Sequence, residues 1–233
     1  MSKNTAPKGL AALFQPIDLT EGPCWKTILR FSFPIILSYL LQQVYSISDA
    51  AIVGQTLSGE QVAGVNDIAP IVNIFLQFAF GVSAGFCVIT SCSVGSHDQP
   101  GVRRSLAAQI VLSAVLTVLL TALALAVLNP MLAWINVTPD SGAVYTAAHT
   151  YCALIFAGIG AQLFYNFICS FLRAMGDSVT PLAFLLFSTV LNVGLDLLFI
   201  LSFGWGVAGA AIATVLAHLI STVACFIYAF SRY

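Results

Sequence analysis

Two aspartates lie inside stretches that are otherwise apolar enough to cross a membrane. Asp49 belongs to a predicted helix over 27–53, and Asp196 belongs to one over 179–202. A charge at membrane depth costs at least ~2.5–3.5 kcal/mol on insertion scales, and such residues tend to mark ion pathways or proton relays. Counted from the helix ends, the two carboxylates lie about four and six residues, or ~6 and ~9 Å, below the same surface. We therefore predict that both acids face one polar site.

Two further oxygen-bearing side chains share this depth. Asn192 precedes Asp196 by about one helical turn, which places both on one helix face. Thr214 lies about six residues into the predicted helix over 208–230, again ~9 Å from the same surface. Carboxylate, amide and hydroxyl oxygens suit a small hard cation such as Na⁺, and the carboxylates can alternatively hold a proton. The ligands predicted for this Na⁺ or H⁺ site are Asp49, Asn192, Asp196 and Thr214, and no other cofactor is expected.

The helix over 27–53 carries a polar stripe that indicates the wall of a cavity. Gln42, Tyr45 and Asp49 recur at spacings of three, four and seven residues. A polar stripe along a membrane helix needs a partner helix or water, because lipid cannot satisfy it. His218 lies one turn from the predicted cation ligand on its own helix, where it could shuttle protons or contact a substrate.

Simpler roles stay open for each of these residues. Asp49 and Asp196 could face water near helix ends, or join helices through hydrogen bonds worth ~0.6 kcal/mol each. His218 could be a hydrogen-bonded core residue. Pro34 removes a backbone hydrogen bond inside the first predicted helix and is either a static kink or a flexible hinge.

The composition shows which elements must position these side chains. The chain has 233 residues, of which 59% are hydrophobic and only 7% are charged, whereas soluble domains carry about 25% charged residues. Charge-free runs longer than the roughly 20 residues of a spanning helix occupy 68–97, 105–139, 141–172 and 197–231. These runs are continuously apolar, which favours helices and rejects a membrane barrel.

We therefore predict an all-α, polytopic membrane protein with one six-helix lobe. A cytoplasmic N-terminal segment over 1–26 shows no signal-peptide pattern. The lobe over 27–233 holds six transmembrane helices, with turn residues between them, at about 27–53, 62–94, 103–128, 143–172, 179–202 and 208–230.

The basic residues indicate the orientation of these helices. With six spans, all eight Lys and Arg residues fall on one side, and the loops after the first, third and fifth helices contain none. The positive-inside rule then places both termini in the cytoplasm. The expected location is the plasma or inner cell membrane. The net charge of −1 gives no indication of a nucleic-acid partner.

The sequence lacks the common catalytic motifs. It has no Walker A loop, no GxSxG and no HExxH. ATP-driven pumping by this chain alone is thus excluded, and an intramembrane enzyme would have to use the same carboxylates. The six cysteines form no CxxC pair, so we expect packing roles for the five in apolar runs rather than disulfides or a zinc site.

Four segments form a pattern that is specific in combination. They read PIILSYLLQQVYSISDAAIVG at 34–54, FLRAMGDSVTP at 171–181, LNVGLD at 191–196 and GWGVAGAAIAT at 204–214. In these segments the chain resembles the multidrug and toxic compound extrusion (MATE) transporters, and specifically their N-terminal six-helix lobe. The resemblance covers nearly the whole chain.

The resemblance implies a transporter, not an enzyme, that exports amphipathic, often cationic, organic compounds in exchange for Na⁺ or H⁺. It implies the same cation ligands: Asp49, Asn192, Asp196 and Thr214. Among the polar residues, Gln42, Tyr45 and Asn166 match positions that line the lobe's cavity, whereas His218 stands where the family varies. Pro34 matches a first-helix proline whose bending has been linked to protonation.

Members of the family have two six-helix lobes, with the substrate path between them, whereas this chain matches one. It is then the N-terminal half of a transporter, a truncated form, or a half that pairs with a second chain. The expected partners are an organic cation, membrane lipid and a second six-helix lobe. Two other functions stay open: a non-transporting remnant or interaction subunit, and a lipid-linked precursor flippase. The flippase would need basic residues in its groove, and this chain has none inside the predicted membrane region.

Overall fold

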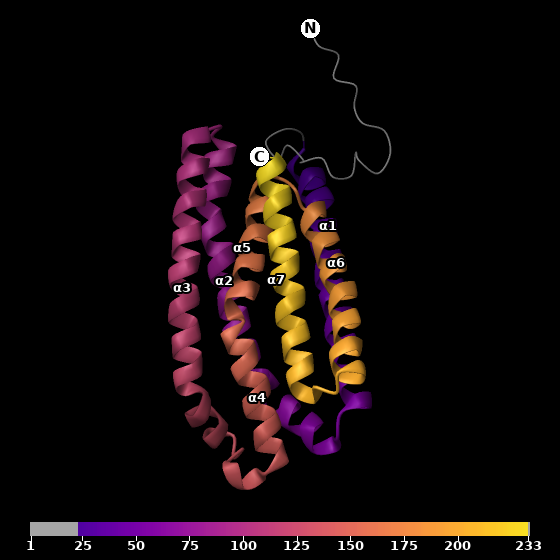
Figure 1. Cartoon of the computed structure of the whole chain (residues 1–233). Helices are drawn as coiled ribbons and strands as arrows, with labels where there is room; N and C mark the ends of the chain where they lie inside the picture. Colours follow the sequence, from indigo (N-terminus) through magenta and orange to yellow (C-terminus); the bar gives the residue numbers. More distant parts are fainter. Residues whose placement is uncertain (1–22, 233) are drawn as a thin grey trace.

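The computed structural model describes residues 23–232, and every regular element in that range is helical. The elements are α1 (Cys24–Thr56), α2 (Gly59–Gly95), α3 (Gln99–Trp134), the 3₁₀ turn η2 (Pro139–Ser141), α4 (Ala143–Ala157), α5 (Ile159–Ala174), α6 (Val179–Asp196), the π-helix η3 (Leu197–Ser202) and α7 (Gly206–Arg232). Figure 1 shows one bundle of helices that run up and down, with the start of α1 and the end of α7 at the same end. Most of the N-terminal segment predicted over 1–26 lies outside the described residues.

The helices are long and apolar enough to cross a membrane. In the described part of the chain, α1, α2, α3, α7 and the continuous helix Val179–Ser202 each qualify as a span, with mean hydropathies from 1.2 to 2.7. Helices α4 and α5 qualify as a pair that is bent by 46°. With this pair counted as one broken span, there are six spans. The prediction of an all-α polytopic membrane protein is therefore confirmed.

The bend between α4 and α5 corrects the single helix predicted over 143–172. It occurs at Gly158, where a Cβ atom would overlap the side chain of Val215 on α7. Two residues later, a Cβ atom on Gly160 would press against Thr117 of α3. The two glycines allow the bent chain to approach both neighbours closely, and this requirement is not visible in local hydropathy.

Helix α3 is longer than the predicted range of 103–128. It continues through Pro130 to Trp134, although proline removes one helical hydrogen bond. Leu128 lies two residues before Pro130 and Leu132 two residues after it, and both are almost fully buried. Burying one such leucine stabilises by about 1.5–3 kcal/mol, which offsets much of the lost bond and keeps the last turns helical.

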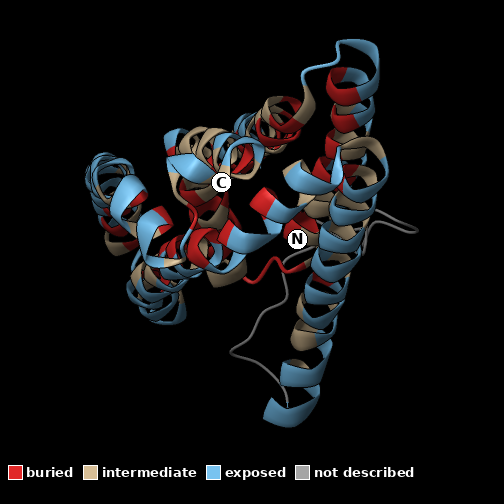
Figure 2. Cartoon of the chain, turned by 90° about the horizontal axis from the view of Figure 1, so that it is seen from below, coloured by how far each residue is buried: buried red, intermediate tan, exposed pale blue. Residues whose placement is uncertain are grey.

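The hydrophobic core lies among α2, α3, α4 and α5, with α7 packed against it. Phe75 of α2 and Phe156 of α4 meet in this core with ring centroids 4.8 Å apart. Helix α1 differs, because within it only Ser38 and Val53 are buried, and it packs mainly against α6. Figure 2 shows buried residues where helices face one another and exposed residues around the outside of the bundle.

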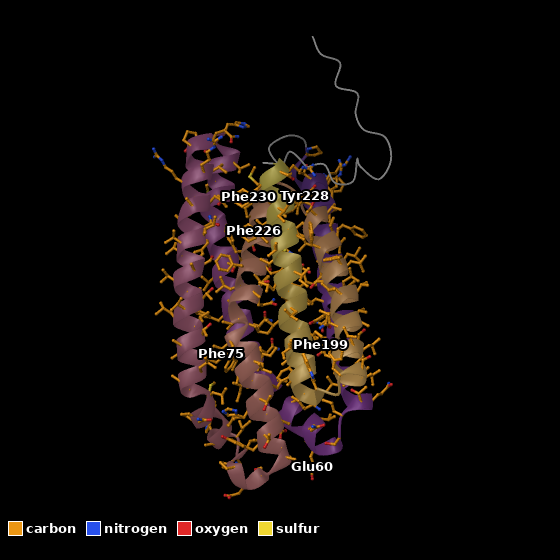
Figure 3. All side chains as sticks on the ribbon, viewed as in Figure 1. Glu60, Phe75, Phe199, Phe226, Tyr228 and Phe230 are labelled. Carbon is orange, nitrogen blue, oxygen red and sulfur yellow. The ribbon has the colours of Figure 1, made fainter. Side chains whose placement is uncertain are left out.

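The up-and-down topology gathers the described basic residues at one end of the bundle, which we call the basic end. They come from the start of α1, the start of α3 and the last turns of α5 and α7: Lys26, Arg30, Arg103, Arg104, Arg173 and Arg232. Glu60, at the start of α2, projects from the opposite end (Figure 3). The bundle therefore has two ends of different charge.

Candidate cation site between α1, α6 and α7

Helices α1 and α6 bring Asp49 and Asp196 together in the half of the bundle that lies away from the basic end. Asp196 is the last residue of α6, directly before the π-helix η3, and its side chain is fully buried. Asp49 is half-buried in α1. The two carboxyl groups are close enough to interact electrostatically. The structure thus places both sequence-predicted acids at one point between two helices.

Asn192 and Thr214 complete the group, and we call the four residues the acid site. Asn192 is fully buried one turn before Asp196, and its side-chain Nδ2 donates to the Thr214 hydroxyl of α7 at 3.4 Å. This bond uses one of the two N–H groups of the amide and leaves its Oδ1 as an acceptor. All four predicted ligands therefore come from the three predicted helices and meet in the structure.

Several oxygens of the acid site lack a donor. Within the described residues, both oxygens of Asp196, Oδ1 of Asp49 and Oδ1 of Asn192 are buried without a hydrogen-bond partner. A buried polar atom without a partner is costly, and a buried unpaired carboxylate is costlier still. Four such acceptors together need positive charge or protons. The donor set, two carboxylates and one amide beside a hydroxyl, fits Na⁺ or protonation of the acids.

An aromatic wall borders the acid site. Tyr45 lies one turn from Asp49 on α1, and its hydroxyl is within electrostatic range of both Asp49 and Asp196. The His218 ring of α7 packs against Tyr45 with centroids 6.1 Å apart and against Tyr165 of α5 at 5.5 Å. The ring nitrogen Nδ1 of His218 is buried without a partner in the described residues. Tyr45 and His218, both predicted to line the cavity, therefore adjoin the acid site.

The sequence analysis did not identify two tyrosines of this wall. Tyr165 is buried beside His218, and Tyr151 of α4 lies within electrostatic range of Asp49, Tyr45 and Asp196. Each is a tyrosine in a charge-free apolar run, which gives no local signal. The bend at Gly158 decides which faces of α4 and α5 meet α7, and it could not be read from the sequence.

The other predicted residues lie apart from the acid site. Gln42 is exposed on α1, and Asn166 is half-buried on α5. No hydrogen bond or ring contact in the described structure joins either to the acid site. Pro34 lies inside the unbroken helix α1, where its carbonyl accepts the Ser38 hydroxyl at 2.8 Å. Its predicted role as a hinge stays a prediction.

Comparison with known proteins agrees with this geometry. A sequence model of the MatE family matches residues 34–198, a range that includes both acids. The chain is 35% identical over 201 residues to "Probable multidrug resistance protein YpnP" of Bacillus subtilis, covering 86% of this chain and 44% of that protein. It is 30% identical over 204 residues to "Probable multidrug resistance protein NorM" of Thermotoga maritima, covering 84% of this chain and 42% of that protein.

A solved structure shows the same fold. A MOP superfamily transporter from Pyrococcus furiosus superposes with a TM-score of 0.82 at 26% identity, covering 92% of this chain and 46% of that one. The chain spans about half the length of the relatives that it matches. From the matched range, the relatives and the shared helical bundle, we conclude that the chain belongs to the multidrug and toxic compound extrusion family.

Proposed function

We propose that this chain is one lobe of an antiporter that exports amphipathic or cationic organic compounds in exchange for Na⁺ or H⁺. The observation that carries the proposal is the set of buried acceptor oxygens without donors at Asp49, Asn192 and Asp196. No donor among the described residues satisfies them, so a mobile cation is the natural partner. The family supplies the wider context, because both relatives compared above are named probable multidrug resistance proteins.

The coupling ion would act on the distance between α1 and α6. With no ion bound, the carboxylates of Asp49 and Asp196 repel each other across the interface. A bound Na⁺ or a shared proton removes this repulsion and attracts the oxygens of both helices. Since α1 buries few residues, its position is the one most easily shifted. Ion occupancy would therefore set how firmly α1 sits against the lobe, with Pro34 as the proposed hinge.

The exported compound would meet the same acids and the aromatic wall. An organic cation is attracted by carboxylates and by the faces of aromatic rings such as Tyr45. One carboxylate pair cannot neutralise both the coupling ion and a cationic substrate. The ion and the substrate therefore compete for the carboxylates. Competition of this kind is the thermodynamic basis of exchange transport.

The polar stripe of α1 is a reason to expect that a second six-helix unit packs against this lobe. Gln42, Gln43 and Ser46 are exposed on the lobe, and lipid cannot satisfy their polar groups. A second lobe or a second chain that covers this face would turn the exposed stripe into the wall of a substrate path. Rocking of two such units would give alternating access.

Efflux of a fluorescent organic cation tests the proposal. In cells that express this chain together with its second six-helix unit, Asp49→Asn should reduce efflux at least tenfold, because the substitution removes one of the two charges that hold the coupling ion. Glu60→Gln, which removes an acid at the end of α2, is the matched control and should keep efflux unchanged. Efflux by Asp49→Asn at the control rate would refute the role of the acid site.

A further inference from the structure

A cavity lies in the half of the bundle away from the acid site, at the basic end. Its volume is about 730 Å³, which is within the range of ligand sites. It opens between the first half of α1 and the last turns of α2, with the end of α5 behind it. We call it the basic-end cavity. It is separate from the acid site, and no residue of the acid site lines it.

The cavity contains a cationic group that no acid among the described residues neutralises. Arg173, in the last turn of α5, lines it, and the Nε atom of this arginine is buried without a hydrogen-bond partner in the described structure. Of the described residues that line the cavity, none is acidic. Arg173 forms no ion pair within residues 23–232, whereas the nearby Asp177 pairs with Arg232 at 3.9 Å. Among the described residues, the Arg173 guanidinium therefore has no anionic partner, and it is available to an anionic ligand.

The polarity of the lining changes along the cavity. His97 and Gln99 lie with Arg173 at the basic end. Phe80 lines the cavity further along α2, where its ring makes an edge contact with Tyr39 of α1 at 6.4 Å between ring centroids. The helix from Phe80 to Gly95 rises ~22 Å, comparable to one extended acyl chain. A ligand with an anionic head and a long apolar tail matches this arrangement.

We propose that the basic-end cavity binds an anionic phospholipid, with its phosphate on Arg173 and one acyl chain along α2 towards Phe80. The planar guanidinium recognises phosphate oxygens through charge-assisted hydrogen bonds. The basic side chains at the start of α1, Lys26 and Arg30, favour a headgroup with net negative charge over a zwitterionic one. Arg173 is thereby the headgroup ligand of a lipid site and has no part in the acid site.

Native mass spectrometry of the detergent-solubilised chain tests this site. The protein is titrated with phosphatidylglycerol and with phosphatidylcholine of the same acyl chains. We expect phosphatidylglycerol to bind with about tenfold preference, and Arg173→Gln to lose it, because one charged hydrogen bond contributes about this factor. Arg104→Gln, an exposed arginine of the same end that does not line the cavity, is the matched control and should retain the preference.

A second variant keeps the test decisive if Arg173→Gln does not fold. Ala84 lines the cavity and is exposed, so Ala84→Phe should fill the acyl region and lower lipid binding while it leaves Arg173 intact. Equal binding of both lipids to the wild type would overturn the proposal. So would displacement of the lipid by inorganic phosphate, which would indicate a simple anion site. Cross-linking of Ala84→Cys to a second protein chain in lipid nanodiscs would likewise show that a protein covers the cavity.

Discussion

Asp196 places two carboxylate oxygens inside the bundle without a hydrogen-bond donor, and Asn192 adds a third buried acceptor one turn away. These residues make the lobe less stable than apolar residues of similar size would, because a buried charge without a partner raises the free energy of the folded state. Under the proposed function, the coupling ion offsets this cost. Stability should therefore depend on the ion that the site binds.

This dependence gives the first prediction. The wild-type chain in detergent should gain thermal stability as Na⁺ replaces choline or as pH is lowered, whichever ion it uses, by about 2.7 kcal/mol at a ligand concentration 100-fold above Kd. Asp196→Asn should be insensitive to both, because it lacks the charge that binds the ion. Thermal unfolding followed by intrinsic fluorescence measures the effect, with Glu60→Gln as control. A response to neither ion in the wild type would contradict the proposed site.

Much of the acid site could be predicted from residue type and helix position alone. Acids inside apolar runs are rare, so Asp49 and Asp196 stood out, and helical rise placed them at one depth. Tyr151 and Tyr165 gave no such signal, because tyrosines are common in membrane helices. Gln109 also went unrecognised, because its partners could not be read from the sequence. Its side chain bridges α2 and α3 by donating to the Phe86 carbonyl at 3.0 Å and to the Thr90 hydroxyl at 2.6 Å.

At the scale of the helices, the bend between α4 and α5 depends on the absence of a side chain at Gly158. A methyl group there would meet the branched side chain of Val215 on α7. The residues over 143–172 form one charge-free apolar run, which predicted a single helix. Helix periodicity indicates which face of a helix is buried, but it does not indicate how closely two helices approach each other.

The second prediction concerns this contact. Gly158→Ala should destabilise the lobe by about 1–3 kcal/mol, the usual cost of forcing extra atoms into a packed interface. The matched control is Gly194→Ala on α6, where a Cβ would meet no atom within 4 Å, and where alanine should be neutral or stabilise by about 0.5–1 kcal/mol. Denaturation in detergent compares the two. A second change, Val215→Ala, should restore much of the stability of Gly158→Ala, and failure of this rescue would argue against the contact.

At the scale of the whole molecule, the distribution of charge between the two ends sets the orientation in the membrane. The described Lys and Arg residues lie at the basic end, while Glu60 and Asp140 lie at the other. The positive-inside rule then predicts that the basic end faces the cytoplasm. This inference was available from the sequence, because it needs only the helix count and the loop in which each basic residue falls.

Labelling of single cysteines in whole cells provides the third test. In a background without the exposed Cys24 and Cys92, Asp140→Cys should react with a membrane-impermeant maleimide. Ser96→Cys, which is exposed at the basic end, should react only after the cells are permeabilised. The opposite pattern would mean that the lobe is inserted the other way round.

The sparse packing of α1 has a consequence for how the protein is made. This helix has the lowest mean hydropathy of the five unbroken spans, 1.2. It is synthesised before the other described helices of the lobe, and four of them separate it from its main neighbour α6. Until α6 is synthesised, Asp49 has no protein environment, and its insertion costs ~2.5–3.5 kcal/mol. We expect α1 to remain at the translocon or in the aqueous phase and to pack against α6 late. The acid site would then be completed together with the lobe.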